Sequence, residues 1–191
     1  YRQSAEKGVL EAKLRLVTIY QEGKVVPADV SEALKWTTEA AESGHVASQY
    51  NLGLLLLGLV DSVSNVDSDP VKAVSWLEKA ANQGHEKSLM LIATMLVEGN
   101  GIDPDPEKAA ELFTQAAEKG NLVAQFNLGV LYELGQGVSQ DFLKAAKWYH
   151  HAANLGHARA QFHLALLHDQ GMGIPQGRPL AFEWYQRAAE Q

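Results

Sequence analysis

The sequence predicts an all-α protein, a right-handed α-solenoid built from helix-turn-helix repeats of about 36 residues. Three observations lead to this prediction. A short motif of small residues that ends in glycine recurs along the chain. Apolar residues between successive copies of the motif follow the period of an α-helix. Each interval also carries signals that start and stop two helices, at matching places.

The recurring motif is written SAEKG, AAESG, AANQG, AAEKG and AANLG, and its glycines are Gly8, Gly44, Gly84, Gly120 and Gly156. The intervals between them are 36, 40, 36 and 36 residues, and the sequence closes on AAEQ. We therefore expect a single repeat domain over 1–191, as a fragment of a longer array. Its parts are the end of a preceding repeat at 1–8, then repeats at 9–44, 45–84 (with a four-residue insertion), 85–120, 121–156 and 157–191.

The first helix of each repeat is predicted from its spacing. Counted from the leading glycine, the fourth residue is small and the eighth and eleventh are apolar, which places them on one helix face. The ninth residue is mostly small, as a close approach between helices requires. Glycine then ends the helix in four repeats, at Gly23, Gly99, Gly135 and Gly171. The small fourth residues are Ala12, Ser48, Ser88, Ala124 and Ala160, and the eighth residues are Leu16, Leu52, Ile92, Leu128 and Leu164.

The second helix of four repeats is predicted to begin after an aspartate N-cap, at Asp29, Asp69, Asp105 and Asp141. Proline follows two of these aspartates directly, where its missing N–H does no harm. An alanine, a tryptophan or leucine, and a pair of alanines then recur at helical spacing before the closing glycine. Two repeats depart from this pattern. The second has Leu59 in place of the glycine that ends the first helix, and the fifth has Gly177 in place of the aspartate.

Residues 120–156, GNLVAQFNLGVLYELGQGVSQDFLKAAKWYHHAANLG, show the whole pattern in one interval. This pattern resembles the Sel-one-like repeat, a branch of the tetratricopeptide superfamily, and the resemblance extends over essentially the whole chain. It implies an adaptor that assembles protein complexes, without catalytic residues shared across the family. One subgroup of that family carries a disulfide in each repeat, whereas this chain has no cysteine.

Composition excludes several classes of protein. The chain is 46% hydrophobic and 20% charged, which is typical of a folded domain. Its longest apolar run, at 51–60, is half the length of a membrane span. The net charge of −7 argues against a nucleic acid or an anionic membrane as the main partner. We therefore expect a soluble chain without a signal or transmembrane segment in this sequence, and both the cytoplasm and the periplasm or secretory pathway are compatible with it.

Histidines are the first residues to consider for chemistry, because five of the seven lie between positions 150 and 168. The sequence predicts His157 as a loop residue and His168 as partly buried and hydrogen-bonded. His163 and His168 are five residues apart and so lie on different faces of a helix. No nucleophile–base motif, phosphate loop or dinucleotide fingerprint is present. We therefore expect no catalytic residue, no cofactor and no metal site.

The sequence predicts that a protein or peptide binds on the first helices, at positions that point away from the packed side. These are the sixth, tenth and thirteenth residues of each repeat, and they form an apolar stripe with acidic residues at its C-terminal end. The alternative is that the sixth residue packs against the neighbouring repeat. The candidate residues are Tyr50, Leu54, Met90, Thr94, Phe126, Val130, Glu133, Phe162, Leu166 and Asp169.

The predicted function is thus a non-enzymatic adaptor or scaffold for a protein or peptide partner. One alternative is a structural segment that self-associates or docks flanking repeats. Another, from a different class, is a hydrolase or metal-dependent enzyme. The insertion at 59–68, LVDSVSNVDS, is interpreted either as a tolerated surface loop or as a docking or phosphorylation loop.

Overall fold

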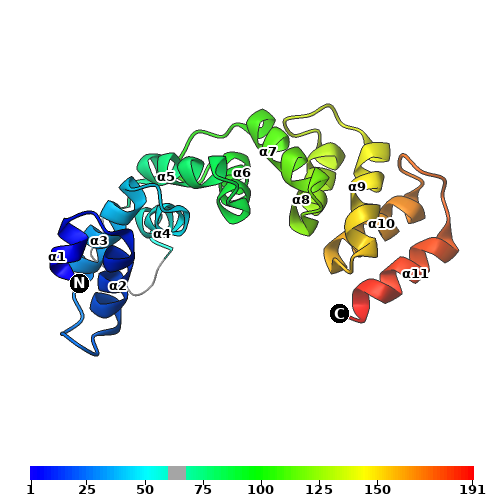
Figure 1. Ribbon diagram of the computed structural model, residues 1–191. Coiled ribbons are helices and arrows are strands. Elements are labelled where there is room, and N and C mark those ends of the chain that lie inside the picture. Colours follow the sequence, from blue (N-terminus) through cyan, green and yellow to red (C-terminus); the bar gives the residue numbers. More distant parts are fainter. Residues whose placement is uncertain (60–67) are drawn as a thin grey trace. The chain divides into compact units, whose positions relative to one another are not determined.

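A computed structural model describes residues 1–59 and 68–191, and within these ranges it contains eleven α-helices and no strand (Figure 1). Residues 60–67, most of the predicted insertion, lie outside the described part. The helices are α1 (Arg2–Glu6), α2 (Leu10–Glu22), α3 (Val30–Glu42), α4 (Val46–Leu56), α5 (Pro70–Asn82), α6 (Glu86–Glu98), α7 (Pro106–Glu118), α8 (Leu122–Leu134), α9 (Phe142–Asn154), α10 (Ala158–Gln170) and α11 (Arg178–Ala189).

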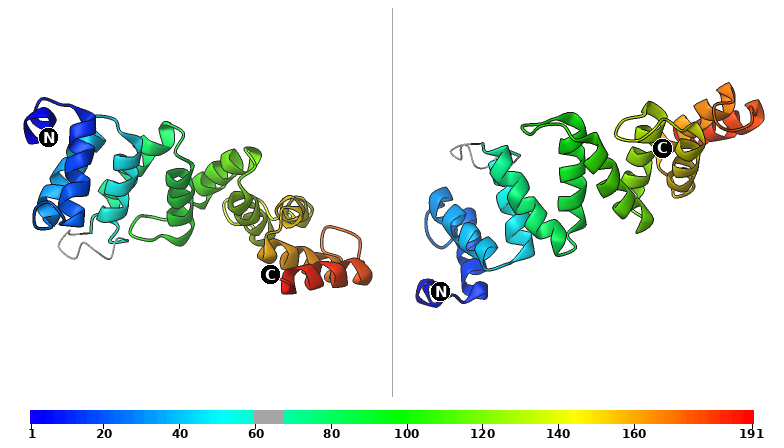
Figure 2. Two further views of the ribbon diagram at one scale, coloured as in Figure 1. Left: turned by 60° about the horizontal axis from the view of Figure 1, so that its bottom comes forward. Right: turned by 90° about the horizontal axis from the view of Figure 1, so that it is seen from above.

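The chain divides into two compact units. Unit 1 comprises residues 1–92 and 100–102, and unit 2 comprises 93–99 and 103–191. Helices α1 to α5 in unit 1, and α7 to α11 in unit 2, each pack against the next helix along the chain, and both views in Figure 2 show this succession within each unit. The predicted fold class, an all-helical protein of successively packed helix pairs, is confirmed. The extent of a single repeat domain over 1–191 stays a prediction.

The aspartate N-caps are confirmed at all four predicted positions. In α3, α5, α7 and α9 the aspartate side chain accepts a hydrogen bond from the backbone N–H three residues later, at 3.0 Å in each case. This bond satisfies a donor that has no partner within the helix. Helix α11 begins at Arg178, and its N-cap residue, Gly177, supplies no side-chain hydrogen bond. The departure seen in the fifth repeat is therefore a real loss of one stabilising interaction.

Glycine ends the first helices where the backbone turns left-handed. Gly135 closes α8 with a φ of 69° and donates its N–H to the carbonyl of Leu131. The closing glycine Gly120 has a φ of 90°, and a Cβ atom added there would meet no atom within 4 Å. Strain at Gly120 would therefore come from the backbone alone.

The recurring small residues let neighbouring helices approach closely. The fourth residue of every repeat is at most 4% exposed. At the ninth residue, a Cβ atom on Gly129 would lie 2.6 Å from the ring of Tyr149, so α8 and α9 can pack at this distance only because Gly129 has no side chain. Tyr149 is itself fully buried in the core of unit 2.

Buried glutamines tie three first helices to the helix before them. The side-chain amides of Gln49, Gln125 and Gln161 donate to a backbone carbonyl near the end of the preceding helix, at 3.0 to 3.2 Å. Two of their side-chain oxygens also accept a bond from a second glutamine, which is Gln83 for Gln49 and Gln191 for Gln161.

The third of these glutamines lacks its second partner. The Oε1 atom of Gln125 is buried and accepts no hydrogen bond in the part of the chain that the structure describes. The position equivalent to Gln191 is 36 residues earlier and holds Leu155, which is 64% exposed. A leucine cannot donate a hydrogen bond, so Gln125 keeps a buried acceptor unsatisfied.

No helix in the described ranges is both long and apolar enough to span a bilayer.

Candidate functional site

The predicted binding residues lie on the first helices, and in unit 2 the site is organised around Phe126 of α8. Its half-buried ring stacks on His157 with 4.7 Å between ring centroids and an interplanar angle of 23°. It also meets the edge of the His163 ring at 5.6 Å and lies 5.8 Å from Tyr149. Because His157 and His163 belong to the following repeat, Phe126 packs against that repeat, as the alternative interpretation of the sixth residue expects.

Glu133 joins α8 to the two helices that follow it. Its carboxylate accepts a hydrogen bond from the hydroxyl of Tyr149 and lies 3.0 Å from Nδ1 of His163. Burial and the bond to Glu133 raise the pKa of Tyr149, so the phenol stays protonated and donates. Glu133 was expected to be a charged residue at the rim of the groove. The structure instead gives its carboxylate two partners and exposes only 26% of its side chain.

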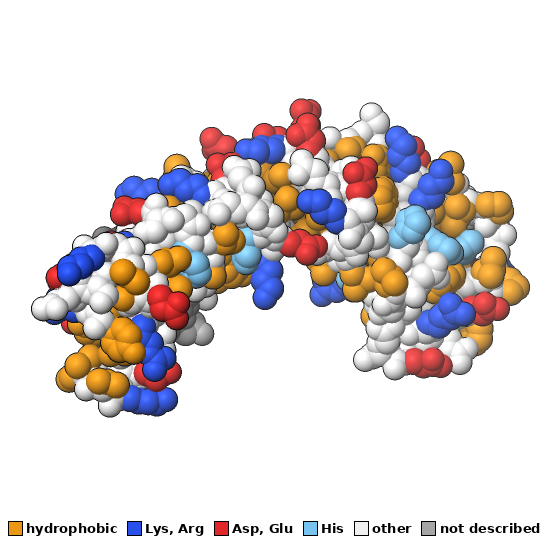
Figure 3. All heavy atoms as spheres, in the orientation of Figure 1, with side chains coloured by type: hydrophobic (Ala, Val, Ile, Leu, Met, Phe, Trp, Pro, Cys, Tyr) orange, Lys and Arg blue, Asp and Glu red, His pale blue; other side chains and the backbone are white. Residues whose placement is uncertain are grey.

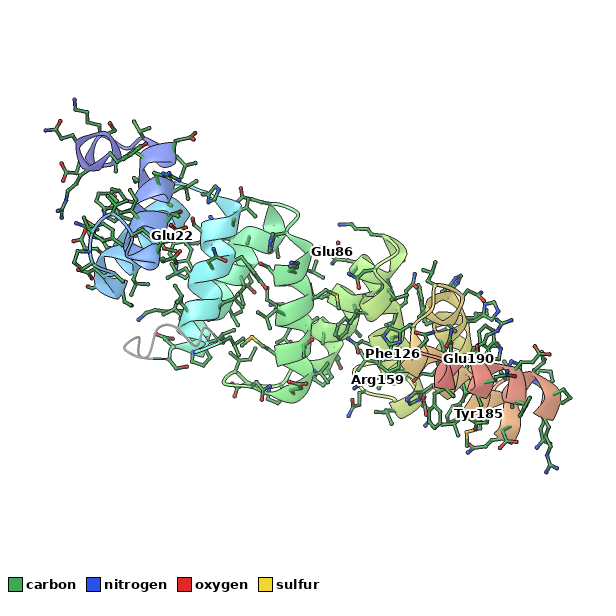
Figure 4. All side chains as sticks on the ribbon, turned by 90° about the horizontal axis from the view of Figure 1, so that it is seen from below. Glu22, Glu86, Phe126, Arg159, Tyr185 and Glu190 are labelled. Atoms are coloured by element: carbon green, nitrogen blue, oxygen red, sulfur yellow. The ribbon has the colours of Figure 1, made fainter. Side chains whose placement is uncertain are left out.

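Phe162 holds the same position on α10, and it is 47% exposed. Its ring centroid lies 5.6 Å from that of Tyr185 on α11 and 6.1 Å from that of His163. Together with Arg159 and the alanines at the end of α11, these residues line a pocket of about 400 Å³, which we call the Phe162 pocket. Figure 4 labels Phe126, Arg159 and Tyr185, which come from the three helices that build this side of unit 2.

Unit 1 carries a related arrangement. Tyr50 on α4 contacts the ring of His85 at 4.6 Å, as Phe126 contacts His157 in unit 2. Leu54, one turn further along α4, lines a pocket of about 480 Å³ that Tyr20 and Leu34 also line. The pocket places a predicted binding residue beside a cavity of the size that ligands occupy.

The remaining candidates differ in how far they are covered. Val130 is half-buried and packs against the core of unit 2, so it is not the solvated position that the helical wheel indicates. Leu166 is also half-buried, and Asp169 is exposed. The charge of Asp169 adds to the effect of burial in raising the pKa of Tyr185. Met90 and Thr94 are half-buried.

His157 lies between α9 and α10, outside both helices, as predicted, and it is also the N-cap of α10. Its Nδ1 atom accepts a hydrogen bond from the backbone N–H of Ala160 at 3.1 Å. His45 and His85 accept from Ser48 and Ser88 in the same way. Burial lowers the pKa of His157, and a neutral ring is the form that can accept this bond.

His168 is half-buried, as predicted. The hydrogen bond that the sequence also predicts for its side chain is not made at Nδ1. The Nδ1 atom of His168 is buried and has no partner among the described residues. Within residues 1–59 and 68–191, no three histidine, aspartate or glutamate side chains come together in a way that could hold a metal ion.

The sequence did not indicate that Tyr149, His157 and His163 would contact Phe126. The N-cap role of His157 had a signal, since histidine follows the closing glycine in three repeats and Asn121, a common N-cap residue, takes the same place in the fourth. The positions of Tyr149 and His163 had none, because they depend on which faces of α9 and α10 meet α8.

Comparison with known proteins shows five matches to the family described as Sel1 repeat, at residues 11–45, 46–85, 87–121, 122–157 and 158–191. No curated protein matches the chain.

Solved structures with similar folds include a protective antigen from uropathogenic Escherichia coli that displays an SLR fold. It is 31% identical, with a TM-score of 0.83, over 99% of this chain and 40% of that protein. A Sel1 repeat protein from Oxalobacter formigenes is also 31% identical, with a TM-score of 0.82, over 95% of this chain and 73% of the other. The chain thus spans well under half the length of the first and about three quarters of the second.

Proposed function

The chain belongs to the Sel1 repeat family, whose members are generally protein-interaction scaffolds, and from this premise we propose that it is a non-enzymatic adaptor that binds a protein or peptide on the face of its first helices. The residues proposed to contact the partner in unit 2 are Phe162, Leu166 and Asp169 of α10, with Phe162 and Leu166 foremost.

The observation that carries this proposal is the mostly apolar pocket that Phe162 of α10 lines on the first-helix face. Nearly half of a large aromatic side chain is in contact with solvent, and the side chains around it are mostly apolar. Burying such a ring against a partner removes apolar area from water, and aromatic residues in pockets often dominate binding energy. Arg159 at the edge of the pocket adds a positive charge that can pair with an acidic group of the partner.

Site-specific photo-crosslinking tests the proposal. A benzophenone amino acid replaces Phe162 in one variant and Phe182 in the control, and both variants are expressed in the source cells. Phe182 is a suitable control because it is 69% exposed on the neighbouring helix α11 and does not line the Phe162 pocket. We expect a discrete adduct with a partner from position 162 and none from position 182.

The adduct then identifies the partner for a direct affinity measurement. Leu166→Glu should weaken binding of the purified partner at least tenfold, because a carboxylate would have to be desolvated against an apolar surface. Equal adducts from positions 162 and 182, or unchanged affinity of the Leu166→Glu variant, would refute the proposal.

A second candidate function is self-association or the docking of further repeats on this face, and the comparison of Phe126 with Phe162 favours it. The following repeat covers Phe126 with His157, whereas the equivalent ring of Phe162 is 47% exposed. A crosslinked product of twice the chain's own mass would support this candidate in place of the first.

A further inference from the structure

A separate pocket of about 500 Å³ lies between α9, α10 and α11, and it shares no residue with the Phe162 pocket. We call it the His168 pocket. Its larger apolar side chains are Leu143, Leu164, Ile174, Leu180 and Trp184. Two of them, Leu143 and Leu180, are each 48% exposed, whereas Leu164 and Trp184 are at most 8% exposed. The pocket thus has a buried apolar floor and an exposed apolar edge.

The pocket is lined by two cationic side chains, Lys147 and Arg187, by one carboxylate, Glu183, and by the rings of His150 and His151. All five side chains are exposed. The guanidinium of Arg187 lies over the Trp184 ring, 4.6 Å from its centroid. On the face shown in Figure 3, histidine side chains lie beside basic and hydrophobic ones over this part of unit 2. The pocket therefore has a basic rim on a chain whose net charge is −7.

The pocket coincides with positions where the fifth repeat departs from the fourth. In the fourth repeat, Lys144 lies over the ring of Tyr132, 5.1 Å from its centroid. The residues 36 positions later are Leu180 and His168, which are shorter and leave this space unfilled.

We propose that the His168 pocket is a second binding site, which takes a peptide segment with an aliphatic or aromatic side chain beside one or more carboxylates. The apolar side chain packs on Leu164 and Trp184, and the carboxylates face Lys147 and Arg187. This combination of an apolar floor with a few polar groups is typical of binding pockets, and the basic rim selects acidic peptides.

Fluorescence anisotropy on the full chain tests this site. The probes are fluorescein-labelled hexapeptides with Leu, Phe or Trp at the two central positions and Asp or Glu at the four outer ones. One control set has lysine at the outer positions, and another has Gly and Ser at the centre. We expect at least one acidic–apolar peptide to bind with a Kd below 1 mM, and both control sets to bind at least tenfold more weakly.

Two substitutions replace a pocket residue with the residue that the preceding repeat carries at the same position. Each new side chain therefore already occurs at that position of the repeat. His168→Tyr fills the pocket with the residue found at Tyr132, and Lys147→Glu reverses a rim charge with the residue found at Glu111. Each should weaken peptide binding at least tenfold. Arg178→Glu, a charge reversal on α11 outside the pocket, should leave the Kd within twofold.

Three results would overturn the proposal: no binding of any acidic–apolar peptide at 1 mM, an unchanged Kd in both pocket variants, or an equal loss in Arg178→Glu. Phe162→Glu separates this site from the first-helix face, because it should abolish binding of the adaptor's partner and leave peptide binding at the His168 pocket within twofold.

Discussion

Replacing Leu155 with glutamine should stabilise the protein, because it supplies the donor that Gln125 lacks. The two other buried glutamines each accept a hydrogen bond from a second glutamine. The side-chain amide of Gln83 lies 2.8 Å from Oε1 of Gln49, and that of Gln191 lies 3.0 Å from Oε1 of Gln161. Position 155 is 30 residues after Gln125, as position 191 is after Gln161, and it is the C-cap of α9. A glutamine at position 155 can therefore reach the buried oxygen without a change of backbone.

The expected gain follows from three contributions. A buried acceptor without a partner destabilises the fold by about 1–3 kcal/mol. Ordering a glutamine side chain costs up to about 2 kcal/mol. Removing Leu155 itself costs little, because that side chain is 64% exposed. The net effect is a gain of about 1 kcal/mol in the free energy of unfolding, or a rise of about 2–4 °C in Tm for a chain of this size.

Urea unfolding followed by circular dichroism measures this gain. Leu155→Glu is the matched control, since glutamate has the same shape as glutamine but its carboxylate only accepts hydrogen bonds at neutral pH. It should give no stabilisation. Leu155→Gln should also lose its effect in a Gln125→Met background, where there is no oxygen to satisfy. Equal stability of the Gln and Glu variants, or a gain that persists beside Gln125→Met, would refute the reasoning.

Three further predictions concern the N-cap histidine, a closing glycine and the helix contacts. The pKa of His157 is lowered below 6.5, so its contribution to stability is complete above pH 6.5 and declines as the pH falls below that value. His157→Asn, which copies the cap at Asn121, should make the urea midpoint less dependent on pH between 7.5 and 5.5. An unchanged pH dependence would count against this role. Gly120→Val should lower the free energy of unfolding by about 1 kcal/mol or more and Gly120→Asn by less, because asparagine tolerates a positive φ better; equal losses would contradict the strain argument. Gly129→Ala should lower the free energy of unfolding by about 1–3 kcal/mol through overpacking, and Leu128→Ala by about 2–5 kcal/mol through the cavity it leaves. Thermal unfolding measures both losses. An unchanged stability of Gly129→Ala would show that α8 and α9 can move apart.

Local signals in the sequence were sufficient to predict the fold. An aspartate N-cap such as Asp141 acts within four residues, and a glycine such as Gly135 acts through its own φ. These interactions do not depend on distant parts of the chain, so each repeat carries its own signals. The agreement of the signals across five repeats supports the same fold. The small fourth residue of each repeat could be assigned to the core for the same reason.

The candidate site was less predictable, because its contacts join residues that are far apart in sequence. Glu133 looked like a solvated charge on a helical wheel, yet Tyr149 and His163, 16 and 30 residues later, hold its carboxylate. The wheel gives the direction of a side chain from its own helix axis. It cannot give what the next two helices place in that direction, and for that reason Val130 was also expected to be more exposed than it is.

The sixth residue of the repeat shows why recurrence alone does not identify a binding surface. Phe126 and Phe162 are both phenylalanines at the sixth position of their repeats. His157 stacks on Phe126, whereas Phe162 is 47% exposed. The ring that stacks on Phe126 comes from the following repeat, and the position equivalent to His157 for Phe162 would be 193, after the last of the 191 residues. A position that varies between repeats, such as the tenth with Thr94, Val130 and Leu166, is under no such common packing requirement. By the same reasoning, the exchange of Tyr132 for His168 changes a filled contact into a pocket. Binding specificity in this chain should therefore reside where the repeats differ, and variants at Leu166 and His168 should affect two different ligands.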